Sequence, residues 1–332
     1  MTVLVTGGAG YIGSHMVWEL VDAGEEVVVL DRLSTGFEWA VAPEAKLVVG
    51  DIGDGALVDE LIAAHGVDAI IHFAGSIVVP ESVADPLAYY DNNTVRTRSL
   101  IESAVKGKVK HFIFSSTAAV YGAAGAEPVQ EDAPLNPESP YGRSKLMSEW
   151  MLADASAAYG LRYTALRYFN VAGADPKGRT GQSTAGATHL IKVAGQAALG
   201  KRPYIEVFGT DYPTPDGTCL RDYIHVSDLA AAHRLALERL RRGGGSLVAN
   251  CGYGHGYSVL EVLDSVRRVH GKDFDVRYAG RRPGDAAAVV ANPGLARREL
   301  GWSPRLDDLD GIVRSALDWE RRLTTMNAPA GR

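Results

Sequence analysis

Closely spaced glycines near the N-terminus constrain the fold of this chain more than any other feature. An apolar run at residues 3–6 is followed directly by four glycines within residues 7–13, and a segment with helical spacing begins at Tyr11. Glycines in this arrangement permit a tight turn, a close approach of the backbone to a diphosphate, and close packing of a helix on a sheet. The pattern predicts a strand, a turn and a helix whose N-terminus binds the diphosphate of a dinucleotide.

Short apolar runs alternate with helical segments through residues 1–170. The apolar runs lie at 3–6, 27–30, 47–49, 69–73, 111–115 and 163–167, and the helical segments at 11–23, 56–64, 86–105 and 141–159. Runs that are apolar throughout are typical of strands buried on both faces of a parallel sheet. The repeated strand–helix units predict the α/β class, with a Rossmann-type doubly wound parallel sheet.

The character of the sequence changes after Asn170. Residues 171–187 are polar and rich in glycine, which indicates a boundary and a binding loop. Further helices are expected at 226–241, 260–270 and 309–323, and Ser258 with Glu261 predicts a capping box.

Two domains follow from this organisation. Residues 1–170 are expected to form the dinucleotide-binding domain, and the chain is expected to return to it within 219–255, with a buried strand near 248–251. Residues 171–332 are expected to form mainly a smaller C-terminal α/β domain that binds the substrate.

Composition excludes several classes of protein. The 332 residues carry a formal net charge of −6 with a sequence pI near 5.9, which argues against a nucleic-acid binder. Two cysteines, Cys219 and Cys251, are too few for a disulfide framework or a four-cysteine zinc site, and no metal site is expected. No run reaches the ~18 uncharged apolar residues of a membrane span, and no basic leader precedes the first apolar run. We expect a cytoplasmic protein.

Residues after the second, third and fourth apolar runs are candidates for cofactor contacts. Asp31 closes the second run, where a carboxylate can accept hydrogen bonds from ribose hydroxyls and repel a 2′-phosphate. This favours NAD over NADP, although Arg32 stands beside it. After the next two runs we expect contacts from Asp51, Ile52, Phe73, Ala74 and Gly75.

A tyrosine and a lysine four residues apart form the candidate catalytic pair. Tyr141 and Lys145 share one face of a predicted helix, so the ammonium group can lie near the phenol. A free phenol, with a pKa of about 10, is a poor base at neutral pH. The lysine cation and a positive nicotinamide would favour its ionised form. The hydroxyls of Ser115, Ser116 and Thr117, at the end of the fifth run, can hold a substrate oxygen against the tyrosine.

These residues resemble the UDP-glucose 4-epimerase (UDP-galactose 4-epimerase) family, a branch of the extended short-chain dehydrogenases/reductases, over nearly the whole chain. The stretch DYPTPDGTCLRDYIHV is the most specific, since generic dehydrogenases do not carry it. The strings that carry the resemblance are TGGAGYIGSH (6–15), HFAG (72–75), VPES (79–82), YYDNN (89–93), SSTAAVYG (115–122), SPYGRSK (139–145), LRYFNVAGA (166–174), FGTDYPTPDGTCLRDYIHVSDLA (208–230) and RRPGD (281–285).

The resemblance implies reversible inversion at C4 of a UDP-hexose through a 4-keto sugar, with an NAD that stays bound. It implies that Tyr141 takes the proton of the 4′-hydroxyl, that Thr117 binds the reacting oxygen, and that Lys145 also holds the nicotinamide ribose. With Ser116, these residues form the expected catalytic set. Arg221 and Arg282 would hold the diphosphate, because guanidinium groups suit phosphate oxygens.

The resemblance and the motifs together define two sets of binding residues. The expected NAD contacts are Gly7, Gly10, Tyr11, Ile12, Gly13, Asp31, Arg32, Asp51, Ile52, Phe73, Ala74, Gly75, Asn92, Ser115, Tyr141, Lys145 and Tyr168. The expected UDP-sugar contacts are Thr117, Tyr141, Phe169, Asn170, His189, Leu190, Glu206, Phe208, Arg221, Arg282, Asp285 and Val289.

Four positions depart from the family's usual pattern. Ile77 stands where many members have a lysine, Arg32 replaces a usual asparagine, and Thr117 replaces a usual serine but keeps the hydroxyl. Val289 occupies a position beside the sugar that varies between large aromatic and small residues. A small side chain there leaves room, so we hypothesise that N-acetylhexosamine substrates are tolerated.

Several alternatives bear on the function. A UDP-N-acetylhexosamine or UDP-pentose 4-epimerase would use the same chemistry, and a non-catalytic NAD-binding regulatory protein is the alternative from a different class. A nucleotide-sugar 4,6-dehydratase is excluded, because Ala118 and Ala119 stand where such enzymes place an acidic pair. The resemblance also suggests a homodimer formed through residues 86–106 and 141–159.

Overall fold

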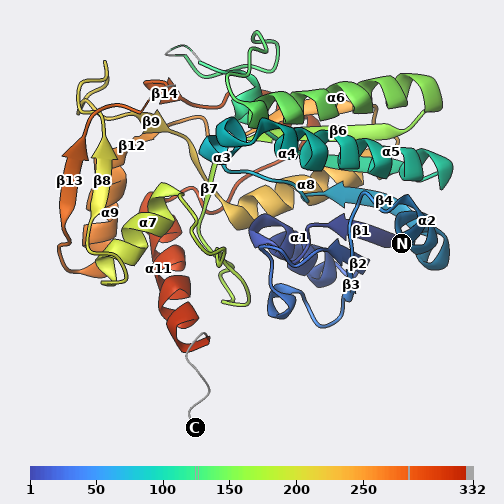
Figure 1. The fold of residues 1–332 in the computed structure, drawn as a ribbon, viewed down its shortest axis with the longest axis horizontal. Coiled ribbons are helices and arrows are strands. Elements are labelled where there is room, and N and C mark those ends of the chain that lie inside the picture. Colours follow the sequence, from blue (N-terminus) through green and yellow to red (C-terminus); the bar gives the residue numbers. More distant parts are fainter. Residues whose placement is uncertain (124, 126, 283–284, 327–332) are drawn as a thin grey trace.

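The computed structural model describes residues 1–123, 125, 127–282 and 285–326, and a large parallel sheet lies at its centre (Figure 1). Within these residues its seven strands are ordered β11-β6-β5-β4-β1-β2-β3, and every neighbouring pair is parallel. The strands are β1 (Thr2–Thr6), β2 (Glu26–Asp31), β3 (Lys46–Val49), β4 (Val67–His72), β5 (His111–Thr117), β6 (Arg162–Tyr168) and β11 (Leu247–Cys251). The strand order reverses beside β1, as in Rossmann folds, so the predicted doubly wound parallel sheet is confirmed.

Helices cover both faces of the sheet (Figure 1). On one face lie α1 (Tyr11–Asp22) and α8 (Val226–Arg241), and on the other α2 (Gly55–His65), α5 (Arg96–Lys106) and α6 (Pro140–Tyr159). Alternate residues of each strand enter separate apolar clusters, so Val5 packs on the first face and Leu4 on the second. Burial on both faces explains why these strands are apolar throughout.

The prediction of a single helix at 86–105 is wrong for the middle of this segment. The chain forms α4 (Pro86–Tyr90), a π-helical turn over Asp91–Val95, and then α5. Asn93 in this turn is buried, and its side chain exchanges hydrogen bonds with the backbone of Ser76, from Ser76 N to Asn93 Oδ1 and from Asn93 Nδ2 to Ser76 O. These tertiary hydrogen bonds accompany the wider turn, which helical periodicity alone cannot indicate.

A second lobe is built from segments that follow β6 (Figure 1). Its small sheets pair β7 (Asn170–Ala172) with β10 (Tyr223–His225), β8 (Ile205–Phe208) with β13 (Val276–Ala279), and β9 (Leu220–Arg221) with both β12 (Tyr257–Ser258) and β14 (Ala288–Val289). Its helices are α7 (Leu190–Ala198), α9 (Val259–His270), α10 (Gly294–Leu300) and α11 (Leu309–Met326). The capping box of Ser258 and Glu261 is confirmed at the start of α9.

The chain does not pass once from the first lobe to the second. It returns to the large sheet with α8 and with β11, which lies beside β6. Among the described residues, no helix is both long and apolar enough to cross a membrane.

The turn between β1 and α1 needs glycine for two separate reasons. Gly7 has a φ of +72°, and a Cβ there would lie 2.6 Å from the backbone nitrogen of Ala74. A Cβ on Gly13 would lie 2.1 Å from the carbonyl oxygen of Gly7. Both clashes are with backbone, so no side-chain rotation can relieve them.

We predict that Gly13→Ala lowers the free energy of unfolding by about 3 kcal/mol, the upper range for overpacking, and reduces the NAD retained on purification. Chemical denaturation and the cofactor content of the purified protein measure the two effects. Gly245→Ala is the control, because a Cβ on Gly245 would meet nothing within 4 Å. Equal stability of the two variants would contradict the close packing of this turn.

Candidate active site

The N-terminus of α1 offers a site for a diphosphate. Gly10 is its N-cap, and among the described residues no side chain caps this helix and no acidic residue lies in its first turn. Asp31, at the end of β2, accepts hydrogen bonds from the backbone nitrogens of Ala9 (2.9 Å) and Leu33 (2.8 Å), which holds its carboxylate beside the turn. Free helix amides, a close glycine turn and a fixed carboxylate fit a dinucleotide such as NAD, with Tyr11 and Ile12 opening the helix.

Charged residues surround the expected adenine side of this site. Asp51 Oδ2 accepts hydrogen bonds from Arg32 Nη1 at 3.2 Å and from Arg96 Nη1. Arg32, which departs from the family pattern, is therefore paired with a carboxylate and half-exposed. Ile52, the next residue after Asp51, is buried.

The loop after β4 is held between the glycine turn and the π-helical turn. The backbone nitrogens of Phe73 and Ala74 both donate to Thr6 O, at 2.9 and 3.1 Å. A Cβ on Gly75 would lie 3.0 Å from Asn93 Oδ1 and 3.8 Å from Lys145 Nζ. This loop therefore connects the cofactor turn to the catalytic helix.

Two neighbouring asparagines play different parts in holding that loop. Asn92 Nδ2 donates to Ser76 Oγ at 2.9 Å, whereas the buried Asn93 also donates to Ser144 Oγ at 3.1 Å. Sequence reasoning singled out Asn92 and missed Asn93. In the sequence, Asn93 is marked only by its place beside Asn92 in YYDNN. In the structure, Asn93 is the buried one of these two asparagines, and it is the one that connects the loop to α6. Ile77 is 48% exposed and leaves the site without the usual lysine.

The structure brings Tyr141, Lys145 and Thr117 together at the carboxyl end of β5. Burial raises the pKa of Tyr141, while a hydrogen bond with Thr117 lowers it. Lys145 Nζ donates to Ser115 O at 2.9 Å and lies 4.7 Å from the centre of the Phe114 ring. Burial lowers the pKa of Lys145 to about 8, opposed by the charge of Glu149, so the side chain remains cationic at neutral pH.

The three hydroxyl residues at the end of β5 do not all face the same way. Ser115 Oγ donates to Tyr168 OH at 2.9 Å, so two residues that are expected to contact the cofactor lie together. Ser116 is fully buried and donates instead to Glu149 Oε1. Alternation along a strand explains the difference, because Ser115 and Thr117 share one face and Ser116 takes the other.

A pocket that is open to solvent lies between the glycine turn and the second lobe. Three expected substrate residues, Asn170, His189 and Leu190, line it together with Tyr11 from the start of α1. Burial lowers the pKa of His189, so its ring is neutral at pH 7. The pocket thus joins residues expected to bind the cofactor to residues expected to bind the nucleotide.

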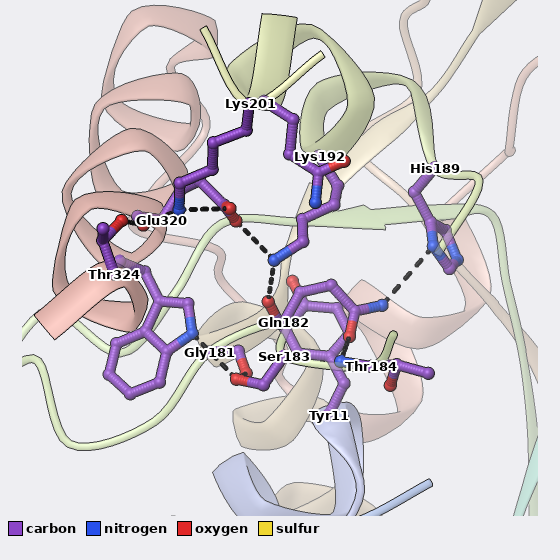
Figure 2. Close-up of polar contacts among 12 residues, drawn as sticks. Tyr11, Gly181, Gln182, Ser183, Thr184, His189, Lys192, Lys201, Glu320 and Thr324 are labelled. Carbon is purple, nitrogen blue, oxygen red and sulfur yellow. Dashed lines mark hydrogen bonds and ion pairs between the residues drawn. The ribbon is translucent and has the colours of Figure 1, made fainter. Parts of the chain in front are cut away.

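Lys192 and Gln182, which line this pocket, belong to a cluster of charged and polar contacts shown in Figure 2. Lys192 Nζ donates to Gln182 O at 2.5 Å and to Glu320 Oε2, and Lys201 Nζ donates to Glu320 Oε1 at 2.7 Å. Both lysines are therefore paired, and their contacts attach α11 to α7 and to the 181–184 loop.

Two arginines of the second lobe, Arg221 and Arg282, lie near other residues that are expected to bind the substrate. Arg221 Nη1 donates to Ala286 O at 2.9 Å, and its Nη2 lies 3.6 Å from Asp285 Oδ1. Arg282 is exposed and lies 3.7 Å from the centre of the Phe208 ring, while Glu206, on the same strand as Phe208, points to solvent. Positions 283 and 284 of the RRPGD string lie outside the described residues.

One small apolar cluster lies beside Thr117. Phe169, after β6, packs with Ala118, which directly follows Thr117, and Val289 of β14 lies against the same cluster. Residues far apart in sequence therefore meet beside the candidate catalytic pair.

We predict that Arg282→Ala weakens UDP binding by roughly 10- to 100-fold, the usual size of a lost hydrogen bond to a charged group. Calorimetric titration with UDP measures the change. Arg281→Ala is the matched control, because the neighbouring Arg281 is paired with Asp211 at 2.7 Å. Equal losses in the two variants would contradict a specific role of Arg282.

The fold and the Tyr141–Lys145 pair on a Rossmann sheet define a dinucleotide-dependent enzyme of the extended short-chain dehydrogenase/reductase class. The family model described as "NAD dependent epimerase/dehydratase family" matches residues 3–252. The chain belongs to this family.

Individual relatives are similar over nearly the whole chain. A UDP-glucose 4-epimerase of Azospirillum brasilense is 59% identical over 329 residues, which cover 99% of this chain and 94% of that protein. The crystal structure of UDP-glucose 4-epimerase from Brucella ovis in complex with NAD has a TM-score of 0.93 at 48% identity, covering 96% of this chain and 97% of that one. The UDP-Glc/GlcNAc 4-epimerase from Campylobacter jejuni has a TM-score of 0.86 at 47% identity, covering 97% and 99%.

Proposed function

We propose that this protein catalyses the reversible C4 epimerisation of a UDP-hexose, interconverting UDP-glucose and UDP-galactose with tightly bound NAD. The observation that carries this proposal is the placement of the Tyr141–Lys145 pair of α6 at the carboxyl end of β5, where Lys145 Nζ donates to Ser115 O, beside a glycine turn that fits a dinucleotide. Relatives that cover nearly the whole chain bear the name UDP-glucose 4-epimerase and support it.

Tyr141 is the proposed base. It takes the proton of the sugar's 4′-hydroxyl, and Thr117 holds the oxygen from which that proton leaves. Burial opposes ionisation of the phenol. In the proposed mechanism, the positive charge of Lys145, one helical turn away, offsets part of this cost. Bound NAD would supply a reversible hydride acceptor for C4, so the complete cycle would need no outside oxidant or reductant.

Inversion requires the 4-keto sugar to turn its other face to the site while the nucleotide stays bound. Arg221 and Arg282 are proposed to hold the diphosphate, with Asn170, His189, Leu190 and Asp285 completing the pocket. Phe208 and Glu206 lie on the adjoining strand β8. Tyr141 then returns its proton to the new hydroxyl, so the same residue acts in both directions.

The sugar itself is the least restricted part of the substrate. Val289 is small and only partly buried against the apolar cluster of Phe169. A second candidate function is therefore epimerisation of UDP-N-acetylhexosamines, and the similarity to a UDP-Glc/GlcNAc 4-epimerase favours it. UDP-pentoses remain a further candidate because they present the same C4 hydroxyl.

The decisive experiment incubates the purified protein with UDP-glucose, UDP-GlcNAc or UDP-xylose without added NAD and separates the products. We expect UDP-glucose to be converted to its C4 epimer without added NAD, because the protein retains its cofactor. The N-acetylhexosamine hypothesis is rejected if UDP-GlcNAc is converted at less than about a thousandth of the rate of UDP-glucose. A difference of this size is larger than one small side chain in a pocket can produce.

A Tyr141→Phe variant tests the base. We expect kcat to fall by at least about 100-fold, because general acid–base catalysis contributes this much, while UDP affinity stays unchanged. Full activity of the variant would overturn the assignment of Tyr141. No turnover by the wild-type protein on any UDP-sugar would instead point to the non-catalytic, NAD-binding alternative.

We also propose that the protein is a homodimer joined through α4, α5 and α6. Large apolar side chains are exposed on these helices and on the π-helical turn between α4 and α5, including Leu87 (77%), Trp150 (56%) and, in the turn, Val95 (54%). α3 (Val79–Ala84) extends the same surface with Val83, which is 65% exposed. Exposed apolar side chains gathered on neighbouring helices are typical of protein interfaces.

We predict that Trp150→Glu converts the dimer to a monomer, because a charge would be buried in an apolar interface. Sedimentation velocity measures the mass. Tyr278→Glu, at a side chain that is 62% exposed on β13 in the second lobe, should leave the mass unchanged. A monomeric wild-type protein would reject this proposal without affecting the catalytic one.

A further inference from the structure

Three buried polar residues form a row across neighbouring strands of the large sheet. Ser116 of β5 pairs in register with Arg167 of β6, and Arg167 pairs with Asn250 of β11. Ser116, Arg167 and Asn250 are buried, with exposed fractions of 0%, 4% and 0%, respectively. Such a row is unexpected inside a parallel sheet whose other strand residues are mostly apolar, and the proposed reaction uses none of its members.

Glu149 of α6 lies against this row. It accepts hydrogen bonds from Ser116 Oγ, from Arg167 Nε at 3.0 Å and from Arg167 Nη2 at 2.6 Å. The side chains of Glu149 and Arg167 are each 5% exposed. The guanidinium is fixed in turn by donating to Tyr121 OH at 2.9 Å, whose own proton goes to Asn250 Oδ1 at 2.7 Å.

The position of Glu149 on its helix links this buried network to the catalytic pair. Tyr141, Lys145 and Glu149 follow one another at four-residue spacing and so share one face of α6. Lys145 donates to Ser115 O and Glu149 accepts from Ser116 Oγ, so two of them are bonded to consecutive residues of β5. Tyr141 lies beside the next residue, Thr117, which lowers its pKa.

We propose that Glu149, paired with Arg167, is a positioning residue that fixes α6 against β5 so that the Tyr141 phenol faces the Thr117 hydroxyl. The inference rests on the proposed function in taking Tyr141 as the reacting group. Ser116 then acts through Glu149 and is a positioning residue as well.

Two physical arguments support a role in geometry. A buried ion pair loses in desolvation much of what its attraction contributes, and well-packed apolar residues are often as stable, so stability alone does not explain this one. Its bidentate form also restricts orientation more tightly than an apolar contact does. In addition, the Glu149 charge opposes the burial that lowers the pKa of Lys145, and His72 of β4 is a further titratable group near that lysine.

Three variants test the proposal in the NAD-containing enzyme. Glu149→Gln keeps an acceptor for Ser116 but loses the charge, Glu149→Ala loses both, and Ser116→Ala removes only the hydroxyl. We expect kcat to fall about 100-fold in Glu149→Ala and about tenfold in the other two, because misplacing reacting groups by ~1 Å has effects of this size. KM and the Kd of UDP should change by less than about threefold, because this group touches neither the sugar nor the nucleotide.

The matched control is Asp68→Asn at the opposite end of the same sheet. Asp68 of β4 forms a similar bidentate pair with Arg241, at 2.9 and 3.1 Å, with side chains 15% and 12% exposed. We expect the control to lower the melting temperature without lowering kcat. An equal loss of kcat in the control, or unchanged kcat in a folded Glu149→Ala or Ser116→Ala, would overturn the proposal.

A readout without turnover separates this proposal from the proposed function. Ultraviolet titration of each enzyme against its own Tyr141→Phe version follows ionisation of the Tyr141 phenol. Because the Thr117 hydrogen bond lowers the pKa of Tyr141, losing that contact in Glu149→Ala should raise the titration midpoint. An unchanged midpoint would reject the positioning role even if the wild-type protein proved inactive on UDP-sugars.

Discussion

Parallel pairing between neighbouring strands is the constraint on which the rest of this structure depends. Because β1, β4, β5 and β6 run in the same direction, their carboxyl ends meet at one edge of the sheet. That edge collects the glycine turn, the loop that follows β4, and the hydroxyl residues of β5. A strand reversed at any of these places would carry its functional residues to the opposite edge.

Burial of charged and polar groups beside this edge sets their chemistry. The hydrogen bond with Thr117 and the burial of Tyr141 move the pKa of the phenol in opposite directions. Burial brings the pKa of Lys145 down to about 8, which leaves it charged at neutral pH but close to titration. The same low-dielectric surroundings strengthen each charged contact and make an unpaired charge costly. Glu149, which is buried on the same helix as Tyr141 and Lys145, is therefore paired with Arg167.

Much of the fold could be predicted from local patterns, and the failures have identifiable causes. Apolar runs marked the first six strands of the large sheet, and the capping box marked α9, because those signals lie within a few residues of each other. The π-helical turn was missed because Asn93 and Ser76, which meet there, are separated in sequence by α3 and α4. Likewise, the hydroxyls of Ser115, Ser116 and Thr117 looked equivalent until strand alternation turned the middle one toward Glu149.

By itself, the sequence determined the class of fold, the glycine turn and the Tyr141–Lys145 pair, because each depends on backbone sterics, burial periodicity or helical spacing over a few residues. Only the tertiary structure decided how Val289, Phe169 and Ala118 meet at one cluster. Net charge gave no hint of the Glu149–Arg167 pair, since opposite charges cancel in composition. Contacts between distant segments form only when burial of the whole chain compensates for the entropy of closing the loops between them.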